Sequence, residues 1–258
     1  MPSSKVRVFA NQKIKYVVSL RVKTVVSLHD ITSLYGQPIT VQIGTDESAR
    51  FSVHEELVCA SSRFFKNAMS QEWVEGRDRV VSLPMDEPEA FELYLQWLYQ
   101  GKLPVRTDAP GREGNLEYVQ LAHAYVLGDR LQDHNFMDTV LDAMVEKTKT
   151  AATDGQKWYP VGPVVRLIYE NTPDSSKARQ LLIDLYAFKA RASWLRDWAE
   201  PDDLPKSFLM ELAIALLETR NPPTKDDPVM EANTCKYHQH GADSTLCYKN
   251  QGKSPKDG

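Results

Sequence analysis

Apolar and β-branched residues alternate with polar ones in three short stretches near the start of the chain. The sequence PITVQIG at 38–44 is rich in Val and Ile, and ARFSV at 49–53 carries an apolar side chain at every second position. The third stretch, RVVSLP, ends at Pro84, whose nitrogen has no hydrogen to donate to a sheet. Since a period of two is typical of strands that bury one face, these stretches predict a small three-stranded sheet.

Helical spacing replaces this alternation between the strands and throughout the rest of the chain. His54 begins the first helical stretch, and Ser61 or Ser62 is a candidate N-cap for the second, which Gly76 interrupts. The clearest amphipathic helix has Pro88 in its first turn and an apolar face made of Phe91, Leu95, Leu98 and Tyr99. Further helices are predicted at 115–127, 129–149, 163–170, 176–198 and 204–219.

The predicted fold class is α+β, with a small three-stranded sheet flanked by helices and followed by an all-helical C-terminal region. The first 29 residues hold six basic residues and no acidic one, as transit peptides do. Their β-branched runs favour an accessory pair of strands or a poorly ordered arm instead. After Asn221 no apolar period survives, which is typical of a flexible tail. The chain therefore divides into an extension, a mixed domain, a helical region and a tail: 1–29, 30–149, 156–220 and 221–258.

Composition and charge exclude several classes of protein. A formal net charge of -4 provides no long-range attraction to nucleic acid or to an anionic membrane. Because no apolar run is long enough to span a bilayer, we expect no membrane-spanning helix. Three cysteines, an odd number, do not suggest a disulfide framework, so we expect a reduced, intracellular protein of the cytoplasm or nucleus.

Four pieces of the sequence resemble the BTB/POZ domain in their order and spacing, from about residue 36 to residue 149. They are FSVHEELVCASSRFFKNAM, VVSLP, EPEAFELYLQWLYQGKLP and LAHAYVLGDRLQ. Downstream, VVRLIYENTPDSS and LLIDLYAFKA resemble the fungal BTB-domain-containing family. This resemblance implies the BTB/POZ fold for the mixed domain.

The cluster HEELVC at 54–59 could be a reactive or metal-binding group, but the resemblance implies a structural role. In this family the histidine at this position ends a strand and orders the turn into the next helix. Acidic residues in a first helical turn also suit the helix dipole, and a cysteine in an apolar helix is usually a small buried hydrophobe. The expected core combines the residues that the resemblance implies with the apolar face of the amphipathic helix. It consists of His54, Leu57, Phe64, Phe65, Phe91, Leu95, Leu98 and Tyr99.

The resemblance also implies protein partners, since BTB domains commonly form homodimers and many bind a cullin in a ubiquitin ligase. The partner-binding side chains are expected at Phe65, Met69, Glu72 and Trp73. Cullin adaptors often carry a hydrophobic-x-Glu triplet here; Met69-Ser70-Gln71 lacks the acid, whereas Ser70-Gln71-Glu72 has the acid but a polar first residue. The alternative is a BTB-type transcriptional regulator or a scaffold that binds no cullin.

Candidate chemistry is confined to the tail. The sequence contains no nucleotide-binding, metalloprotease or serine-hydrolase motif, so we expect neither an enzyme nor a small-molecule substrate. A C-x2-H-x-H-x6-C pattern supplies four candidate zinc ligands, and the alternative is scattered residues in a flexible segment. A DNA-reading finger would need a longer module and a basic helix, so we expect no nucleic-acid partner. The four residues are Cys235, His238, His240 and Cys247.

Two apolar features of the C-terminal region suit either a core or a partner surface. Trp194 and Trp198 lie four residues apart, which predicts core anchors; if exposed, they would be binding hot spots. The last predicted helix is apolar nearly all round and is expected to be buried or docked on a partner.

Overall fold

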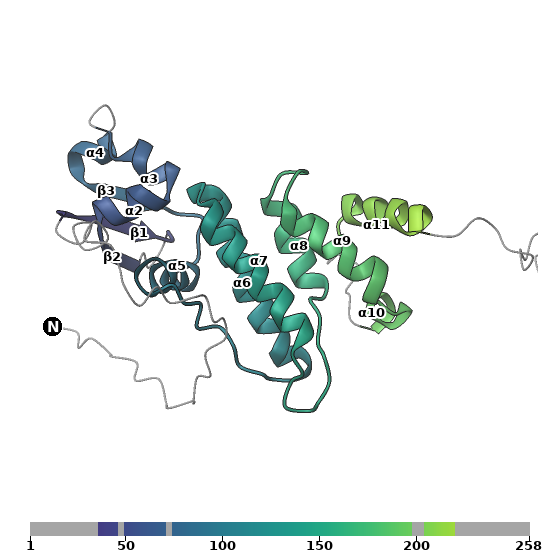
Figure 1. The fold of residues 1–258 in the computed structure, drawn as a ribbon. Helices are drawn as coiled ribbons and strands as arrows, with labels where there is room; N and C mark the ends of the chain where they lie inside the picture. Colours follow the sequence, from purple (N-terminus) through teal and green to yellow (C-terminus); the bar gives the residue numbers. More distant parts are fainter. Residues whose placement is uncertain (1–35, 46–48, 71–73, 198–203, 220–258) are drawn as a thin grey trace, which may run out of the picture. The chain divides into compact units, whose positions relative to one another are not determined.

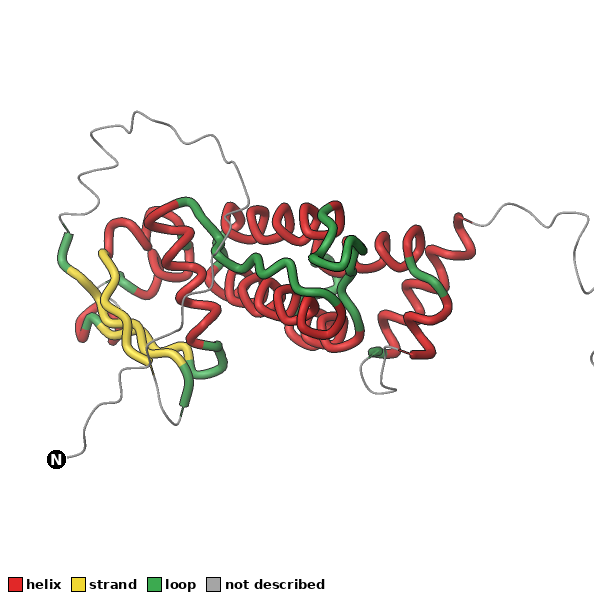
Figure 2. Tube along the Cα trace, turned by 90° about the horizontal axis from the view of Figure 1, so that it is seen from below, coloured by secondary structure: helices red, strands yellow, loops and turns green. Residues whose placement is uncertain are grey.

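The computed structural model describes residues 36–45, 49–70, 74–197 and 204–219. Its three strands form one sheet in the order β2-β1-β3, drawn in Figures 1 and 2. Strands β1 (Pro38–Ile43) and β2 (Ala49–His54) pair antiparallel, with Val41 opposite Phe51. Strand β3 (Val80–Leu83) pairs with β1 in parallel. The three predicted strands are therefore confirmed, and β1 is central.

Alternation along β1 places its apolar side chains on one face of the sheet. Ile39, Val41 and Ile43 point to the same face and are at most 1% exposed. On the neighbouring strands, Val53, Val81 and Leu83 are also buried. This face of the sheet therefore carries the apolar side chains that the helices cover.

Short helices fill the connection between β2 and β3. Helix α2 (Glu55–Ser61) follows β2 directly, and α3 (Arg63–Ala68) has Ser62 as its N-cap, whose hydroxyl accepts a hydrogen bond from the Phe65 N–H. Helix α4 (Val74–Asp78) contains Gly76, which was expected to interrupt the helical pattern. A Cβ at Gly76 would lie 2.3 Å from the carbonyl oxygen of Ser70, so the glycine permits a close backbone approach.

The next three helices complete the mixed domain. Helix α5 (Pro88–Gln100) ends at Gly101, whose φ of 65° is a left-handed conformation that glycine adopts without strain. Helix α6 (Gly111–Leu131) begins four residues before the predicted helix at 115, and α7 (His134–Lys149) follows it after a short turn. Helix α6 packs against α3, α5, α7 and α8, so it is central to the helical layer.

The C-terminal region is helical, as predicted. It contains α8 (Gly162–Asn171), α9 (Lys177–Lys189), α10 (Ala192–Asp197) and α11 (Lys206–Thr219). A single helix was predicted at 176–198, but Ala190 adopts an extended conformation and separates α9 from α10. No helix in the described part of the chain is long and apolar enough to cross a membrane.

The chain forms two compact units, residues 1–213 and 214–258. The described core of the first unit extends from the sheet to Leu212 in α11. In the second unit, the described residues are the last turns of α11, where Ile214, Leu216 and Leu217 are exposed.

Candidate functional site

The residues expected in the core separate into three groups. Phe65 and Phe91 are fully buried, whereas Phe64, Leu95 and Leu98 are partly buried and pack against the core. Leu57 and His54 are half-buried. Tyr99 departs from the expectation because its side chain is 40% exposed. Helix α5 instead buries Ala90, Phe91, Leu93 and Tyr94, so its inward face is rotated relative to the predicted one.

His54 and Tyr99 form a polar link at the point where β2 becomes α2. The Tyr99 hydroxyl accepts a hydrogen bond from the His54 backbone N–H at 3.1 Å and lies 2.9 Å from the ring Nδ1. Arg79 supports the same junction, because its guanidinium lies 2.7 Å from Glu55 Oε2 and donates to the carbonyl of Gln37 at 2.9 Å. The ring, the tyrosine and the first-turn glutamate therefore all stabilise backbone geometry.

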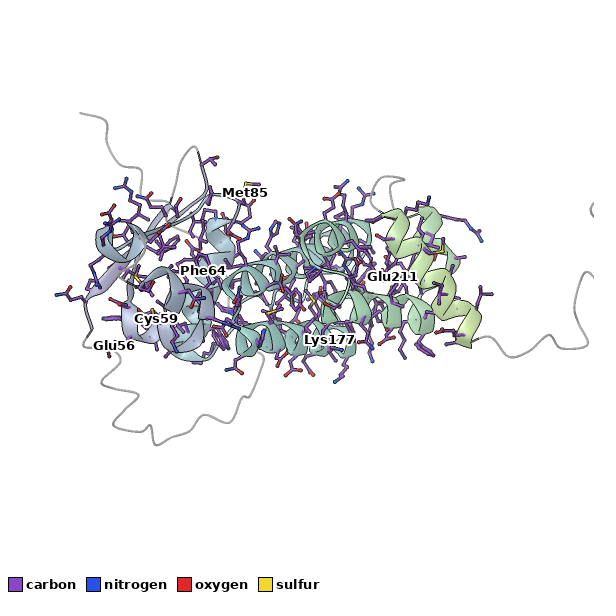
Figure 3. The ribbon with its side chains drawn as sticks, turned by 90° about the horizontal axis from the view of Figure 1, so that it is seen from above. Glu56, Cys59, Phe64, Met85, Lys177 and Glu211 are labelled. Carbon is purple, nitrogen blue, oxygen red and sulfur yellow. The ribbon has the colours of Figure 1, made fainter. Side chains whose placement is uncertain are left out.

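Cys59, labelled in Figure 3, lies in α2 four residues after Glu55. Burial, followed by the charge of Glu55, raises the pKa of the Cys59 thiol to about 11. The reactive thiolate is therefore depleted at neutral pH, which does not suit a nucleophile or a metal ligand.

Alkylation should report this pKa directly. At pH 8 we expect Cys59 in the folded chain to react with iodoacetamide about a hundredfold more slowly than in the urea-unfolded chain, because the thiolate fraction falls about tenfold per pKa unit. The rate in the folded chain should rise steeply as the pH approaches 11. Mass spectrometry of the peptide that contains Cys59 measures both rates, and equal rates at pH 8 would contradict the prediction.

A buried carboxylate joins three helical segments beneath the junction. Asp133 is fully buried; its Oδ2 accepts hydrogen bonds from the Ser61 hydroxyl at 2.5 Å and the Tyr94 hydroxyl at 3.0 Å. Its Oδ1 accepts from the Phe136 N–H at 3.1 Å, which makes Asp133 the N-cap of α7. Burial, together with this carboxylate, raises the pKa of Tyr94, so its hydroxyl stays protonated as a donor. The residues Ser61, Tyr94 and Asp133 are therefore structural.

An open hollow of about 400 Å³ lies on the surface above this network, between α2, the end of α5 and the start of α7. Trp97 contributes to it and is held in place, since its Nε1–H donates to the Thr139 hydroxyl at 3.1 Å and its ring stacks on Tyr94 at 5.9 Å. Apolar and polar groups contribute about equally to the surface of the hollow, which resembles the mixed character of non-obligate protein–protein interfaces. We call it the α2–α5 hollow; its lining residues are Leu57, Ala60, Ser61, Trp97, Leu98, Gly101 and Asn135.

The structure places the predicted partner-binding residues differently. Phe65 is fully buried in the core, so it cannot contact a partner while the domain is folded, and this prediction was wrong. Met69 is half-buried at the end of α3. Glu72, Trp73, Trp198 and the proposed zinc ligands Cys235, His238, His240 and Cys247 lie outside the described residues, and zinc binding stays a prediction.

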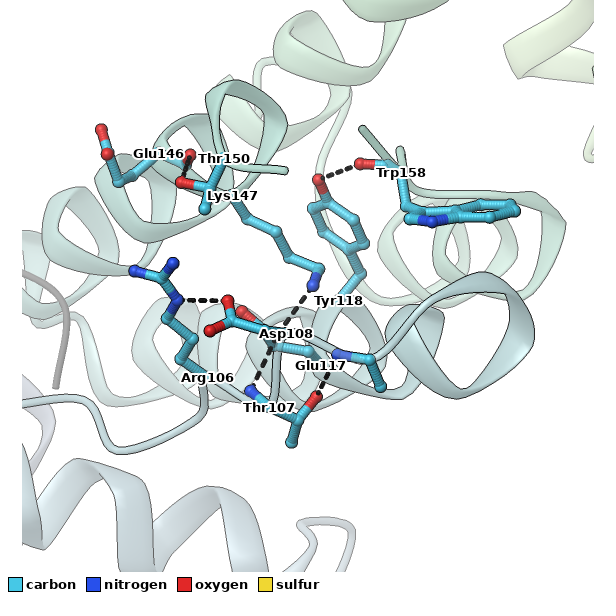
Figure 4. Close-up of polar contacts among 10 residues, drawn as sticks. Arg106, Thr107, Asp108, Glu117, Tyr118, Glu146, Lys147, Thr150 and Trp158 are labelled. Atoms are coloured by element: carbon cyan, nitrogen blue, oxygen red, sulfur yellow. Dashed lines mark hydrogen bonds and ion pairs between the residues drawn. The ribbon is translucent and has the colours of Figure 1, made fainter. Parts of the chain in front are cut away.

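A second polar network lies where the loop after α5 meets α6 and α7, as Figure 4 shows. Glu117 is only 5% exposed; its Oε2 lies 2.7 Å from Lys147 Nζ and accepts from the Thr107 N–H at 3.2 Å. The Lys147 ammonium also lies 5.0 Å from the centre of the Tyr118 ring. Sequence analysis missed this pair, although Glu117 stands on an otherwise apolar face of α6 and such an acid usually needs a partner.

Three comparisons with known proteins bear on this fold. Residues 33–145 match the family model described as the BTB/POZ domain. No curated protein matches the chain. Among solved structures, the BTB domain of zebrafish PATZ1 matches at 17% identity over 41% of this chain and 75% of that chain, with a TM-score of 0.30, too low to support an argument. On the family match, with the sheet and helices just described, residues 33–145 of the chain are a BTB/POZ domain.

Proposed function

We propose that this protein is a self-associating adaptor that binds a cullin-type ubiquitin ligase subunit through the α2–α5 hollow. The BTB/POZ domain is a protein–protein interaction module. The single observation that carries the proposal is the hollow itself, which is open and combines apolar with polar groups around Trp97, a side chain held by its hydrogen bond to Thr139 and its stacking on Tyr94. A preformed surface of this kind loses little conformational entropy when a partner binds.

The attachment of the C-terminal helices supports an adaptor role. The Tyr118 hydroxyl donates to the Trp158 carbonyl at 2.9 Å, and the Ser176 hydroxyl donates to the Tyr125 hydroxyl at 3.2 Å. Helices α6 and α8 also pack directly together. A cullin bound at the hollow and a client bound at the later helices would therefore be held by one packed unit, as a ligase adaptor requires.

Calorimetry with the N-terminal region of a class-three cullin tests the proposal, with light scattering to follow the protein's mass. We expect a micromolar dissociation constant and a mass twice that of one chain. Ala60→Glu should weaken cullin binding at least tenfold, because Ala60 is exposed and lines the hollow, so a charge enters the apolar contact without disturbing the core.

Ala213→Glu is the matched control, since Ala213 is also an exposed helical alanine but lies in α11. It should bind the cullin as the unaltered chain does. Equal weakening by both variants would contradict the assignment to the hollow. A dimer mass without any cullin binding would reject the ligase role and favour the scaffold alternative.

A further inference from the structure

A second pocket, with a volume of about 460 Å³, shares no lining residue with the α2–α5 hollow. It is built by the start of α6, the irregular segment 156–161 and the turn between α9 and α10. The segment is fixed on both sides, because the Trp158 carbonyl accepts from Tyr118 and the Val161 N–H donates to Asn115 Oδ1 at 3.3 Å. We call it the basic pocket, for the charges described next.

The charged side chains that line the basic pocket are all positive. Lys157, Lys189 and Arg191 come from two separate parts of the chain, and each is exposed. No acidic residue lines the pocket, and none of these three cations forms an ion pair with a described carboxylate. The nearby Asp154 carboxylate instead accepts from the Trp158 indole N–H, with its Oδ2 at 3.2 Å. The three cations repel one another when the pocket is empty. An anion bound there would therefore be attracted by all three and would reduce this repulsion.

Aromatic rings supply the apolar wall of the same pocket. The ring centres of Tyr159 and Trp194 are 5.0 Å apart, and Trp194 meets the buried Tyr186 edge to face at 5.2 Å. Trp194 is half-buried. One part of its ring packs against the core, as predicted for a core anchor, and the rest is accessible to a partner. An aromatic wall beside exposed cations can bind a ligand that is both anionic and apolar.

From this arrangement we infer that the basic pocket binds an acidic peptide segment that carries an apolar or aromatic side chain. Carboxylates or phosphates of the peptide would pair with Lys157, Lys189 and Arg191, and its apolar side chain would pack against Tyr159 and Trp194. The cations lie around one pocket, whereas proteins that bind nucleic acid usually carry a basic groove or stripe along the backbone of the ligand. The chain also has a net negative charge, so we favour a peptide over a nucleic acid. This inference rests on the proposed adaptor function and adds the kind of client protein that the adaptor would hold, one with an acidic segment.

Fluorescence anisotropy with the full chain and labelled synthetic peptides tests the inference. The probes are glutamate-rich peptides with one central leucine, phenylalanine or tryptophan, with glutamine-rich and phosphoserine-rich versions of each. We expect the glutamate peptides to bind, the glutamine peptides to bind at least tenfold more weakly, and the affinity to fall as NaCl is added. The phosphoserine versions show whether carboxylate or phosphate is the preferred anion.

Paired variants locate the binding. Lys189→Gln combined with Arg191→Gln should weaken peptide binding about tenfold, since each exposed ion pair contributes little alone. Lys177→Gln combined with Lys206→Gln removes the same charge from exposed positions outside the pocket and should leave binding unchanged. Equal loss in both pairs, no peptide binding, or tighter binding of a single-stranded oligothymidylate would overturn the inference. Cullin binding is measured separately, so failure here leaves the ligase proposal standing.

Discussion

Asp133→Ala should lower the free energy of unfolding by about 3–5 kcal/mol. The substitution removes the N-cap of α7, which contributes about 1 kcal/mol, and leaves the buried Tyr94 hydroxyl and the part-buried Ser61 hydroxyl without their acceptor. Each such hydroxyl costs about 1–3 kcal/mol, although relaxation of Ser61 towards solvent reduces its share. Urea unfolding followed by circular dichroism measures the loss.

Asp133→Asn provides the matched control. Its amide retains one oxygen that can accept from the Phe136 N–H or from the two hydroxyls, so we expect a smaller loss of about 1–2 kcal/mol. Tyr94→Phe removes one donor and keeps the ring, so it should cost less than Asp133→Ala. A chain with Asp133→Ala that is as stable as the Asp133→Asn variant would contradict the role of the carboxylate as a shared acceptor.

Glu117→Ala should lower the free energy of unfolding by about 3 kcal/mol. The Lys147 side chain is only 11% exposed, so losing the carboxylate leaves an ammonium group largely buried without its counter-charge. The Thr107 N–H loses its acceptor at the same time. Thermal and urea unfolding of the same preparation should agree on the size of the loss.

A double variant distinguishes the effect of the unpaired charge on stability from the effect of lost side-chain volume. Glu117→Gln with Lys147→Met keeps similar volumes and removes both charges, and buried ion pairs replaced in this way are often close to neutral in stability. We therefore expect the double variant to lie within about 1 kcal/mol of the unaltered chain. A double variant as unstable as Glu117→Ala would show that packing, and not the unpaired charge, dominates.

The sequence predicted the sheet and the order of the helices because those depend on local periodicity. It placed the inward face of α5 only in part, since Phe91, Leu95 and Leu98 pack in or against the core, whereas Tyr99 is exposed and Ala90, Leu93 and Tyr94 are buried in addition. The choice between these faces depends on which neighbours cover them, and periodicity does not contain that information.

The candidate sites were harder to predict for the same reason. The place of Glu117 on an apolar face of α6 indicates that it has a partner, but only the folded chain identifies Lys147 as that partner and brings Asp133 to Tyr94. The basic pocket brings together Lys157 and Arg191, which are more than thirty positions apart in the sequence, so no local motif predicts it. By contrast, the place of His54 at the strand-to-helix turn was predicted from the family resemblance, whereas its link to Tyr99 in α5 again depends on the folded chain.

The packing of α6 against α8 has a consequence for how the protein can be divided. Tyr118 and Tyr125 in α6 bond to Trp158 and Ser176, which lie beyond residue 145, where the family match ends. A fragment cut at that point would expose the apolar surface that α8 covers and would lose both bonds. The domain recognised by sequence is therefore smaller than the unit that unfolds cooperatively, and truncation at the family boundary should favour aggregation.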